Sequence, residues 1–301
     1  KIAFISARSN CYVGCGAWCP SMVLTRCDSD GKNMYIISHS NGEAEYSPSV
    51  TDDGRIIYTR WEYNDKWVQR IQSLWTVNPD GTSQNTYWGN QSQWPDHLGE
   101  ARQVPDSPLV IFTGMGHHDM YNGSIGFVDV RRGFDYPDGL IKITSDLEWG
   151  EMGDGPIPPV PASSSYHPSE EIAGYKSPYP LSEELFLVSA RTGTRFVKSV
   201  AGYKDDPNRG FFKLYLMDIY GNRELIYQGN FNVLYGKPVK SRKKPRIIPD
   251  RVAWPGKEEE GKEVKPGSFY SSNVLEGLPE EVKKRAKYLR VIENVHRTYS
   301  E

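Results

Sequence analysis

Two adjacent histidines are the sharpest candidates for chemistry in this sequence. His117 and His118 lie between two strand-like stretches, and Asp119 follows them. Histidine is the usual general base near neutral pH and a common metal ligand. Because neighbouring side chains point in different directions, a metal ion would need further ligands, such as Asp119, His97 or Asp96. In the structural alternative, one histidine caps a neighbouring loop by hydrogen bonding and the other is solvated. The sequence does not identify a metal ion.

A second candidate group is Arg60-Trp61-Glu62-Tyr63, which continues a strand into a loop. A ligand bound here would meet the guanidinium of Arg60, the aromatic side chains of Trp61 and Tyr63, and the carboxylate of Glu62. The alternative is that Arg60 pairs with a carboxylate and Trp61 lies in the core. Tyr179 and Glu183 lie in a loop before a later strand, where we expect them to contact a ligand in a central funnel.

The four cysteines are confined to the first 27 residues, at Cys11, Cys15, Cys19 and Cys27. Their spacing, C-x3-C-x3-C-x7-C, lacks the C-x2-C pairs of structural zinc sites. An iron–sulfur or zinc site through three or four thiolates is the alternative, but two disulfides are favoured. Four cysteines permit three pairings, and the sequence does not choose among them. Disulfides would indicate an oxidising, periplasmic or extracellular compartment.

The elements that must position these residues are short strands separated by turns. Turns with Asp and Gly follow apolar strands near Asp30, Asp80, Asp129 and Asp218. Their separations are 50, 49 and 89 residues. The sequence period of four-stranded propeller blades is about 40 to 50 residues. The last separation fits one blade with a long insertion, which we place in the Pro-, Gly- and Ser-rich loop 148–176. The pattern predicts an all-β fold, a β-propeller of four-stranded blades over residues 1–235.

Four blades are fewer than most propellers contain, and an open ring leaves exposed edge strands. The chain begins within a strand, so we expect these blades to belong to a six- or seven-bladed ring of a longer protein. After residue 235 the pattern changes. Residues 236–267 are basic, then acidic, and are interpreted as a Pro- and Gly-containing linker, although the basic run could contact phosphate or anionic lipid. Residues 268–301 are predicted to begin a C-terminal segment with a helix whose first residue is Pro279 and a strand at Tyr288–Ile292.

Composition narrows the possible functions. The chain has 301 residues and a formal net charge of −2, which gives no general attraction to nucleic acid. No apolar run approaches the roughly 20 residues that span a bilayer. The C-x-x-C-H motif that attaches c-type haem is also missing, so no cofactor is predicted within this chain.

Several motifs together resemble a known family. The run Ser47–Ile56, with its Asp-Gly turn, and Asn78-Pro79-Asp80-Gly81 resemble TolB-type β-propellers. Four further motifs are similar to the middle domain of the hydrazine synthase alpha subunit and its uncharacterised relatives. They are Tyr58–Tyr63, the His117-His118 pair before Gly123-Ser124, Pro178–Glu183 and Asp218–Tyr227. The resemblance spans about residues 2–252. It implies an exported protein with c-type haem in domains outside this chain, and the missing haem motif argues against assigning hydrazine synthesis.

Two functions follow as expectations. The first is an exported propeller module of a larger, redox-associated protein, which binds a ligand or the remaining domains and subunits through the face bearing His117, His118 and Arg60. The second is a lyase that cleaves uronic-acid glycans by β-elimination. It would use a base drawn from His117, His118 or Tyr63, and Arg60 to neutralise the substrate carboxylate.

Overall fold

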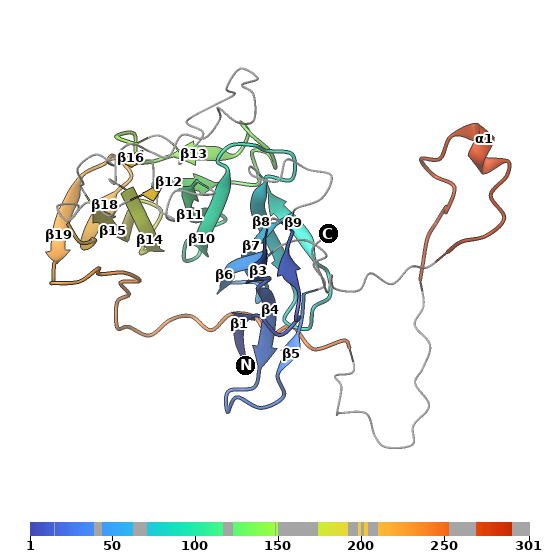
Figure 1. The fold of residues 1–301 in the computed structure, drawn as a ribbon, viewed down its shortest axis with the longest axis horizontal. Coiled ribbons are helices and arrows are strands. Elements are labelled where there is room, and N and C mark those ends of the chain that lie inside the picture. Colours follow the sequence, from blue (N-terminus) through green and yellow to red (C-terminus); the bar gives the residue numbers. More distant parts are fainter. Residues whose placement is uncertain are drawn as a thin grey trace.

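Strands form nearly all the regular structure of this computed structural model (Figure 1). It describes residues 1–14, 16–38, 44–62, 71–116, 123–147, 149, 174–191, 198–199, 202–203, 210–252 and 269–290. The prediction of an all-β fold is confirmed. None of the helices in these ranges has the length and apolar character needed to cross a membrane.

The main strands fall into four successive antiparallel units. Unit 1 consists of β1 (Ile2–Ser6), β4 (Val23–Cys27) and β5 (Tyr35–Ile36). Unit 2 consists of β6 (Ala44–Val50), β7 (Ile56–Trp61), β8 (Gln72–Val77) and β9 (Asn85–Trp88). Unit 3 consists of β10 (His97–Gln103), β11 (Val110–Met115), β12 (Gly123–Val128) and β13 (Leu140–Lys142). Unit 4 consists of β14 (Gly174–Pro180), β15 (Leu185–Arg191), β18 (Lys213–Asp218) and β19 (Arg223–Tyr227).

The remaining elements are short. They are the β2 (Tyr12–Val13) and β3 (Gly16–Pro20) pair, the β16 (Lys198–Ser199) and β17 (Gly202–Tyr203) pair, and α1 (Glu280–Lys283). The helix begins at Glu280, one residue later than predicted, because Pro279 has a ψ of 146° and is the N-cap rather than the first helical residue. Tyr288, Leu289 and Arg290, the described part of the predicted last strand, are not in a strand.

The predicted turns close the outer hairpin of each unit. In β4–β5, β8–β9 and β18–β19, the amide of Gly31, Gly81 or Gly221 donates to the carbonyl three residues earlier. These glycines have φ values of 82°, 82° and 91°, which side-chain-bearing residues rarely adopt. The equivalent turn in unit 3 begins at Asp129. Turns with Asp and Gly between apolar strands therefore located these hairpins correctly.

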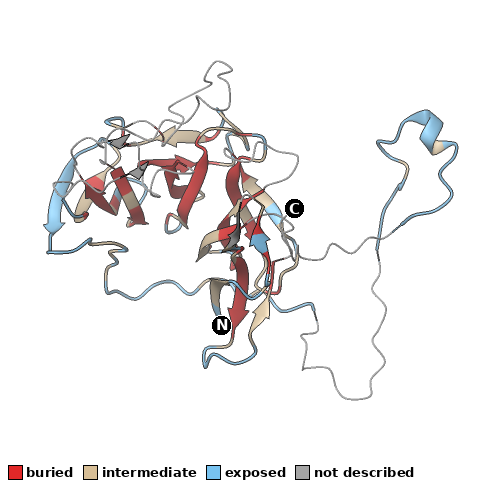
Figure 2. Ribbon diagram, in the orientation of Figure 1, coloured by how far each residue is buried: buried red, intermediate tan, exposed pale blue. Residues whose placement is uncertain are grey.

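Apolar clusters hold successive units together. Leu24 of unit 1 packs with Tyr58 of unit 2, and Trp88 of unit 2 packs with Phe112 of unit 3. Phe127 of unit 3 meets Phe186 of unit 4 edge-on, with ring centroids 6.5 Å apart. Figure 2 shows these strands as the buried part of the fold. Units 2 to 4 join into one 12-stranded sheet, unit 1 forms a separate sheet, and the described residues do not close into a ring.

The first strands of units 2, 3 and 4 share one irregularity. Each has seven residues, and each shifts register against the second strand at its fourth residue. These fourth residues, Ser47, Glu100 and Ser177, have φ values of 49°, 56° and 54°. A residue with positive φ at a register shift is a β-bulge, which re-aims the side chains that follow it.

The bulged strands have two distinct ends. At the loop end, β6, β10 and β14 begin beside the last residues of β7, β11 and β15. At the strap end, the same first strands finish in hairpin turns. We call residues 228–252 the strap, because they run from β19 back to β1 past this end (Figure 1).

Contacts with three units fix the strap. Lys243 pairs with Asp106 of unit 3 at 2.5 Å, and the amide of Arg246 donates to the carbonyl of Asp52 at 3.1 Å. Asp250 accepts two hydrogen bonds of 2.8 Å from Arg26 in unit 1. The described part of the predicted linker, residues 236–252, is therefore attached to the β units along its length.

Candidate binding site at the strap end

The side chain of Arg60, at the loop end, is held by contacts within the protein. Its guanidinium lies 3.8 Å from the carboxylate of Glu62 and 4.4 Å from the ring centre of Trp75. Trp61 is buried in an apolar cluster. This matches the structural alternative expected from the sequence, in which Arg60 pairs with a carboxylate and Trp61 belongs to the core. Glu62 is thus engaged by Arg60, and both side chains are nearly buried.

The histidine candidates are only partly described. Asp96 and His97 are buried at the loop end, where the ring of His97 lies 5.5 Å from that of Tyr46. Tyr63, His117, His118 and Asp119 lie outside the described residues. Within the part of the chain that the structure describes, no cluster of three or more His, Cys, Asp or Glu side chains is suited to a metal ion.

Glu45 is the loop-end group with the clearest perturbation. Its carboxylate is buried between units 1 and 2 and accepts hydrogen bonds from Ser38 and from the amide of Leu24. Burial raises the pKa of Glu45 from 4.5 to about 6, although these hydrogen bonds and Arg60 oppose the change. The folded state therefore binds this proton more tightly than the unfolded state does.

We expect the Glu45 carboxyl to make stability depend on pH. Its contribution is fully present below pH 4.5 and is lost as the pH rises to about 6, a change of about 2 kcal/mol. The free energy of unfolding, measured by denaturant titration across this range, should fall by that amount relative to Glu45→Gln. Parallel curves for the two proteins would contradict the assignment.

The cysteines do not support the predicted pair of disulfides. Cys11, Cys19 and Cys27 are free thiols, and Cys15 lies outside the described residues. Two disulfides among four cysteines would require one bond between two of these three. Cys11 and Cys27 are instead buried, and the thiol of Cys11 lies 3.3 Å from the carbonyl oxygen of Ser9. Thiols in such settings behave as small apolar side chains.

The strap end contains an accessible cavity of about 400 Å³. It is lined by the ends of β6, β10 and β14 and by the strap. Ser49, Arg102 and Tyr179 are the residues that resume the regular register after the three bulges. All three line this cavity, so equivalent positions of three units converge on one space. Tyr179, predicted as a ligand-binding residue, is therefore at the opposite end of the strands from Arg60.

Glu183 has a different role from Tyr179. It lies in the β14–β15 turn and accepts a hydrogen bond of 2.6 Å from Ser107 in the β10–β11 turn. This bond joins the hairpins of units 3 and 4 beside the cavity. The predicted site residues are thus divided between the two ends of the fold. At the strap end, Tyr179 lines the cavity, whereas Glu183 joins two of the hairpins next to it.

Charged side chains of both signs line the cavity: Arg102, Lys240, Arg242 and Lys243, with Asp52 and Asp106. The guanidinium carbon of Arg102 lies 5.8 Å from the ring centre of Tyr179, and Arg242 of the strap donates to the Tyr179 hydroxyl at 3.4 Å. Burial lowers the pKa of Arg102, Glu100 opposes this, and the nearby charge of Arg242 adds to the lowering. Among the described residues, no carboxylate is within 4.0 Å of either guanidinium. Both arginines can therefore bind an anion.

A buried carboxylate fixes the strand that carries Arg102. Glu100, at the bulge of β10, accepts hydrogen bonds from the amide and hydroxyl of Ser177 in β14 and from Thr113 in β11. Burial, followed by the charge of Glu100, raises the pKa of Tyr235 in the strap. The Glu100 carboxylate thus links the first strands β10 and β14, two residues before Arg102.

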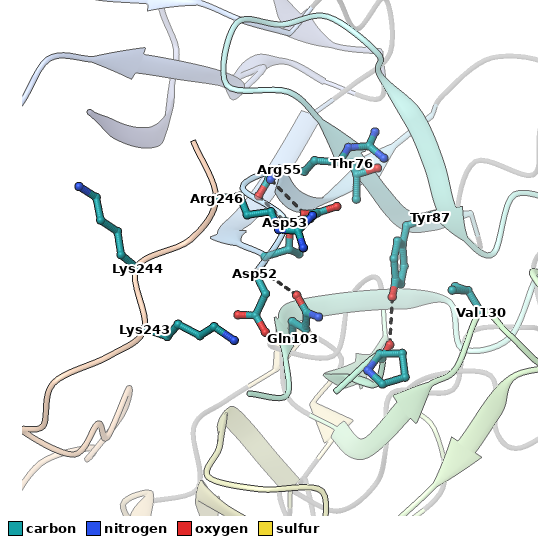
Figure 3. A pocket seen from close by; sticks show the side chains of 12 residues that line it. Asp52, Asp53, Arg55, Thr76, Tyr87, Gln103, Val130, Lys243, Lys244 and Arg246 are labelled. Carbon is teal, nitrogen blue, oxygen red and sulfur yellow. Dashed lines mark hydrogen bonds between the residues drawn. The ribbon is translucent and has the colours of Figure 1, made fainter. Parts of the chain in front are cut away.

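Figure 3 shows a neighbouring cavity of about 460 Å³. It lies between units 2 and 3, and Lys243 extends from the strap toward Asp52 and Gln103. Asp52 accepts a hydrogen bond from the amide of Asp106, and its own amide donates to Gln103 at 2.8 Å. Each cavity is lined by two carboxylates and four cationic side chains, and Asp52 and Lys243 line both, so charge alone does not distinguish them. The cavity at Arg102 differs because equivalent positions of three units converge on it.

Reasoning from sequence missed Arg102 and Arg242. Arg102 follows no recognised motif, and its position becomes evident only when the three bulged strands are aligned with one another. Arg242 belongs to the basic run 237–246, for which phosphate contact had been the alternative to a solvated linker.

Comparisons with protein-family models and with curated proteins find no match for this sequence.

Proposed function

We propose that this chain is a β-propeller-type module that binds a small oxyanionic ligand in the cavity at Arg102 and Arg242. The four units would be its blades, and the bulged first strands would surround its axis. The observation that carries this proposal is the convergence of Ser49, Arg102 and Tyr179, three equivalent positions, on one cavity. Radially repeated blades place equivalent first-strand residues around a shared axis.

The lining of the cavity suits a carboxylate, phosphate or sulfate group. A guanidinium presents a planar set of N–H donors that matches the oxygens of such groups. Arg102 comes from the rigid β10 and Arg242 from the strap, so an oxyanion between them would contact both walls. The volume of about 400 Å³ lies within the range of small-molecule sites. Tyr179 adds an aromatic face and a hydroxyl beside both guanidinium groups.

Calorimetric titration of the full chain with inorganic phosphate tests this proposal. We expect saturable binding that weakens about tenfold or more in Arg102→Gln and in Arg242→Gln, since each substitution removes charged hydrogen bonds. Arg132→Gln is the matched control, because Arg132 is exposed and does not line the cavity. Equal affinity in the wild type and both cavity variants, or no binding at all, would refute the site.

The exported, haem-associated setting stays a prediction from the resemblance. The lyase hypothesis also stays a prediction. Arg60 is already paired with Glu62 and Trp75 instead of being free to neutralise a substrate carboxylate, so we favour binding at the strap end over catalysis at the loop end. Release of unsaturated uronic ends from polygalacturonate by the purified chain would reverse that preference.

A further inference from the structure

The cavity at Arg102 continues into the cavity of Figure 3. Asp52, Gln103 and Lys243 line both, so the two spaces adjoin at these side chains. Their volumes are about 400 and 460 Å³, each within the range of small-molecule sites. Because the strap lines both cavities, they form one trough that follows the strap across the ends of units 2, 3 and 4.

The trough is positively charged in a chain whose formal net charge is −2. Seven cationic and three acidic side chains line it, and five of the seven cations belong to the strap. A concave surface lined mainly by one sign of charge attracts ligands of the opposite sign. A single phosphate between Arg102 and Arg242 would leave the cations of the second cavity unused. The trough as a whole therefore suits a ligand with several acid groups.

Most of these cations are not paired with carboxylates of the protein. In the ranges that the structure describes, Lys243 is the only one of the seven within 4.0 Å of a carboxylate, that of Asp106. The side chains of this pair are 73% and 70% exposed, and ion pairs so exposed contribute little to stability. Lys243 can therefore turn from Asp106 to an acid group at the junction of the two cavities.

The acidic and aromatic side chains of the trough favour a sugar over a bare polyanion. Among the described residues, Asp52 and Asp53 each accept hydrogen bonds through only one carboxylate oxygen. Their other oxygens would repel a polyphosphate, but they can accept hydrogen bonds from hydroxyl groups. Tyr87 lines one cavity and Tyr179 the other, and each ring offers an amphipathic surface for a sugar ring.

We propose that the trough binds an acidic oligosaccharide, which carries carboxylate or sulfate groups on successive sugars. This proposal rests on the proposed function, because one acid group would lie between Arg102 and Arg242. Another would lie beside Arg246, in the second cavity. Joining two acid groups in one molecule makes the second contact intramolecular, which raises the affinity above that of either group alone.

Two acidic tetrasaccharides, tetragalacturonate and a heparin tetrasaccharide, are the calorimetric probes for the full chain. We expect at least one of them to bind about tenfold or more tightly than galacturonate, and the tighter of the two identifies the acid group as carboxylate or sulfate. Maltotetraose has the hydroxyl groups without the charge and should not bind. Tripolyphosphate has the charge without the hydroxyl groups and should bind more weakly than the acidic sugar.

Arg246→Gln separates this proposal from the proposed function. It should weaken binding of the acidic tetrasaccharide about tenfold, because a charged contact is lost. Affinity for inorganic phosphate should stay within about twofold of the wild type, which also shows that the variant is folded. Arg132→Gln is again the matched control, since Arg132 lines neither cavity, and it should change neither affinity.

Four results would overturn the proposal. They are tetrasaccharides that bind no more tightly than galacturonate, equal binding of maltotetraose, tighter binding of tripolyphosphate, and an unchanged tetrasaccharide affinity in Arg246→Gln. If phosphate still binds at Arg102 and Arg242 in any of these cases, the oligosaccharide is excluded and the anion site stands. If phosphate does not bind the wild type, both proposals fail.

Discussion

Trp149→Ala is expected to lower the free energy of unfolding by about 3 to 5 kcal/mol, as truncation of buried aromatic side chains typically does. Trp149 is 3% exposed and stacks on Phe112 of β11, with ring centroids 5.6 Å apart. It lies over Gly114 and Gly126, where an added Cβ would come within 2.2 and 2.6 Å of its ring. The indole thus fills a space that two glycines leave open.

Chemical denaturation of the variant and of Phe231→Ala measures this effect. Phe231 is 80% exposed, so its truncation should change the free energy of unfolding by less than about 0.5 kcal/mol. Trp149→Phe should recover part of the loss, because the smaller ring can still stack on Phe112. If Trp149→Ala were as stable as Phe231→Ala, the indole would not be part of the core.

The parts of the fold predicted correctly are those encoded by neighbouring residues. A turn with Asp and Gly needs only a positive φ and a few local hydrogen bonds, so Gly31, Gly81 and Gly221 identify hairpins without knowledge of the rest of the chain. The apolar runs between them indicated the strands and the all-β class. Trp149 lies outside any strand, as predicted for the loop that contains it, but its packing against two distant glycines has no local pattern and was not predicted.

The candidate site was harder to predict because it depends on long-range arrangement. Tyr179 was predicted as a ligand residue, but only the structure relates it to Arg102, far earlier in the chain, through equivalent bulges. The strap was interpreted as a linker because Pro and Lys are typical of solvated segments, and its contacts with Asp52, Asp106 and Arg26 involve residues distant in sequence. Local composition indicates that a segment is extended but not what it lies against.

Attachment of the strap is central to the proposed function, because Arg242 reaches the cavity only while the strap is in place. Substitutions at two glycines allow the effect of this attachment to be measured separately from that of backbone strain. Gly54 and Gly221 both close hairpin turns and have φ values of 89° and 91°. A Cβ at Gly54 would lie 2.1 Å from the carbonyl oxygen of Arg246, whereas a Cβ at Gly221 would meet nothing within 4 Å.

Gly54→Ala is therefore expected to destabilise the protein more than Gly221→Ala. Both variants bear the strain of a positive φ, about 1 kcal/mol. Only Gly54→Ala must also displace the strap, which should bring its total loss to about 3 kcal/mol. Denaturant titration measures both losses, and limited trypsin digestion reports the strap, since cleavage after Arg242 and Lys243 should accelerate in Gly54→Ala alone. Phosphate binding should weaken in the same variant, because Arg242 moves away from Arg102. Equal stability, digestion and binding in the two variants would mean that the strap does not rest on the β6–β7 turn, and Arg102 would then have to bind the anion without it.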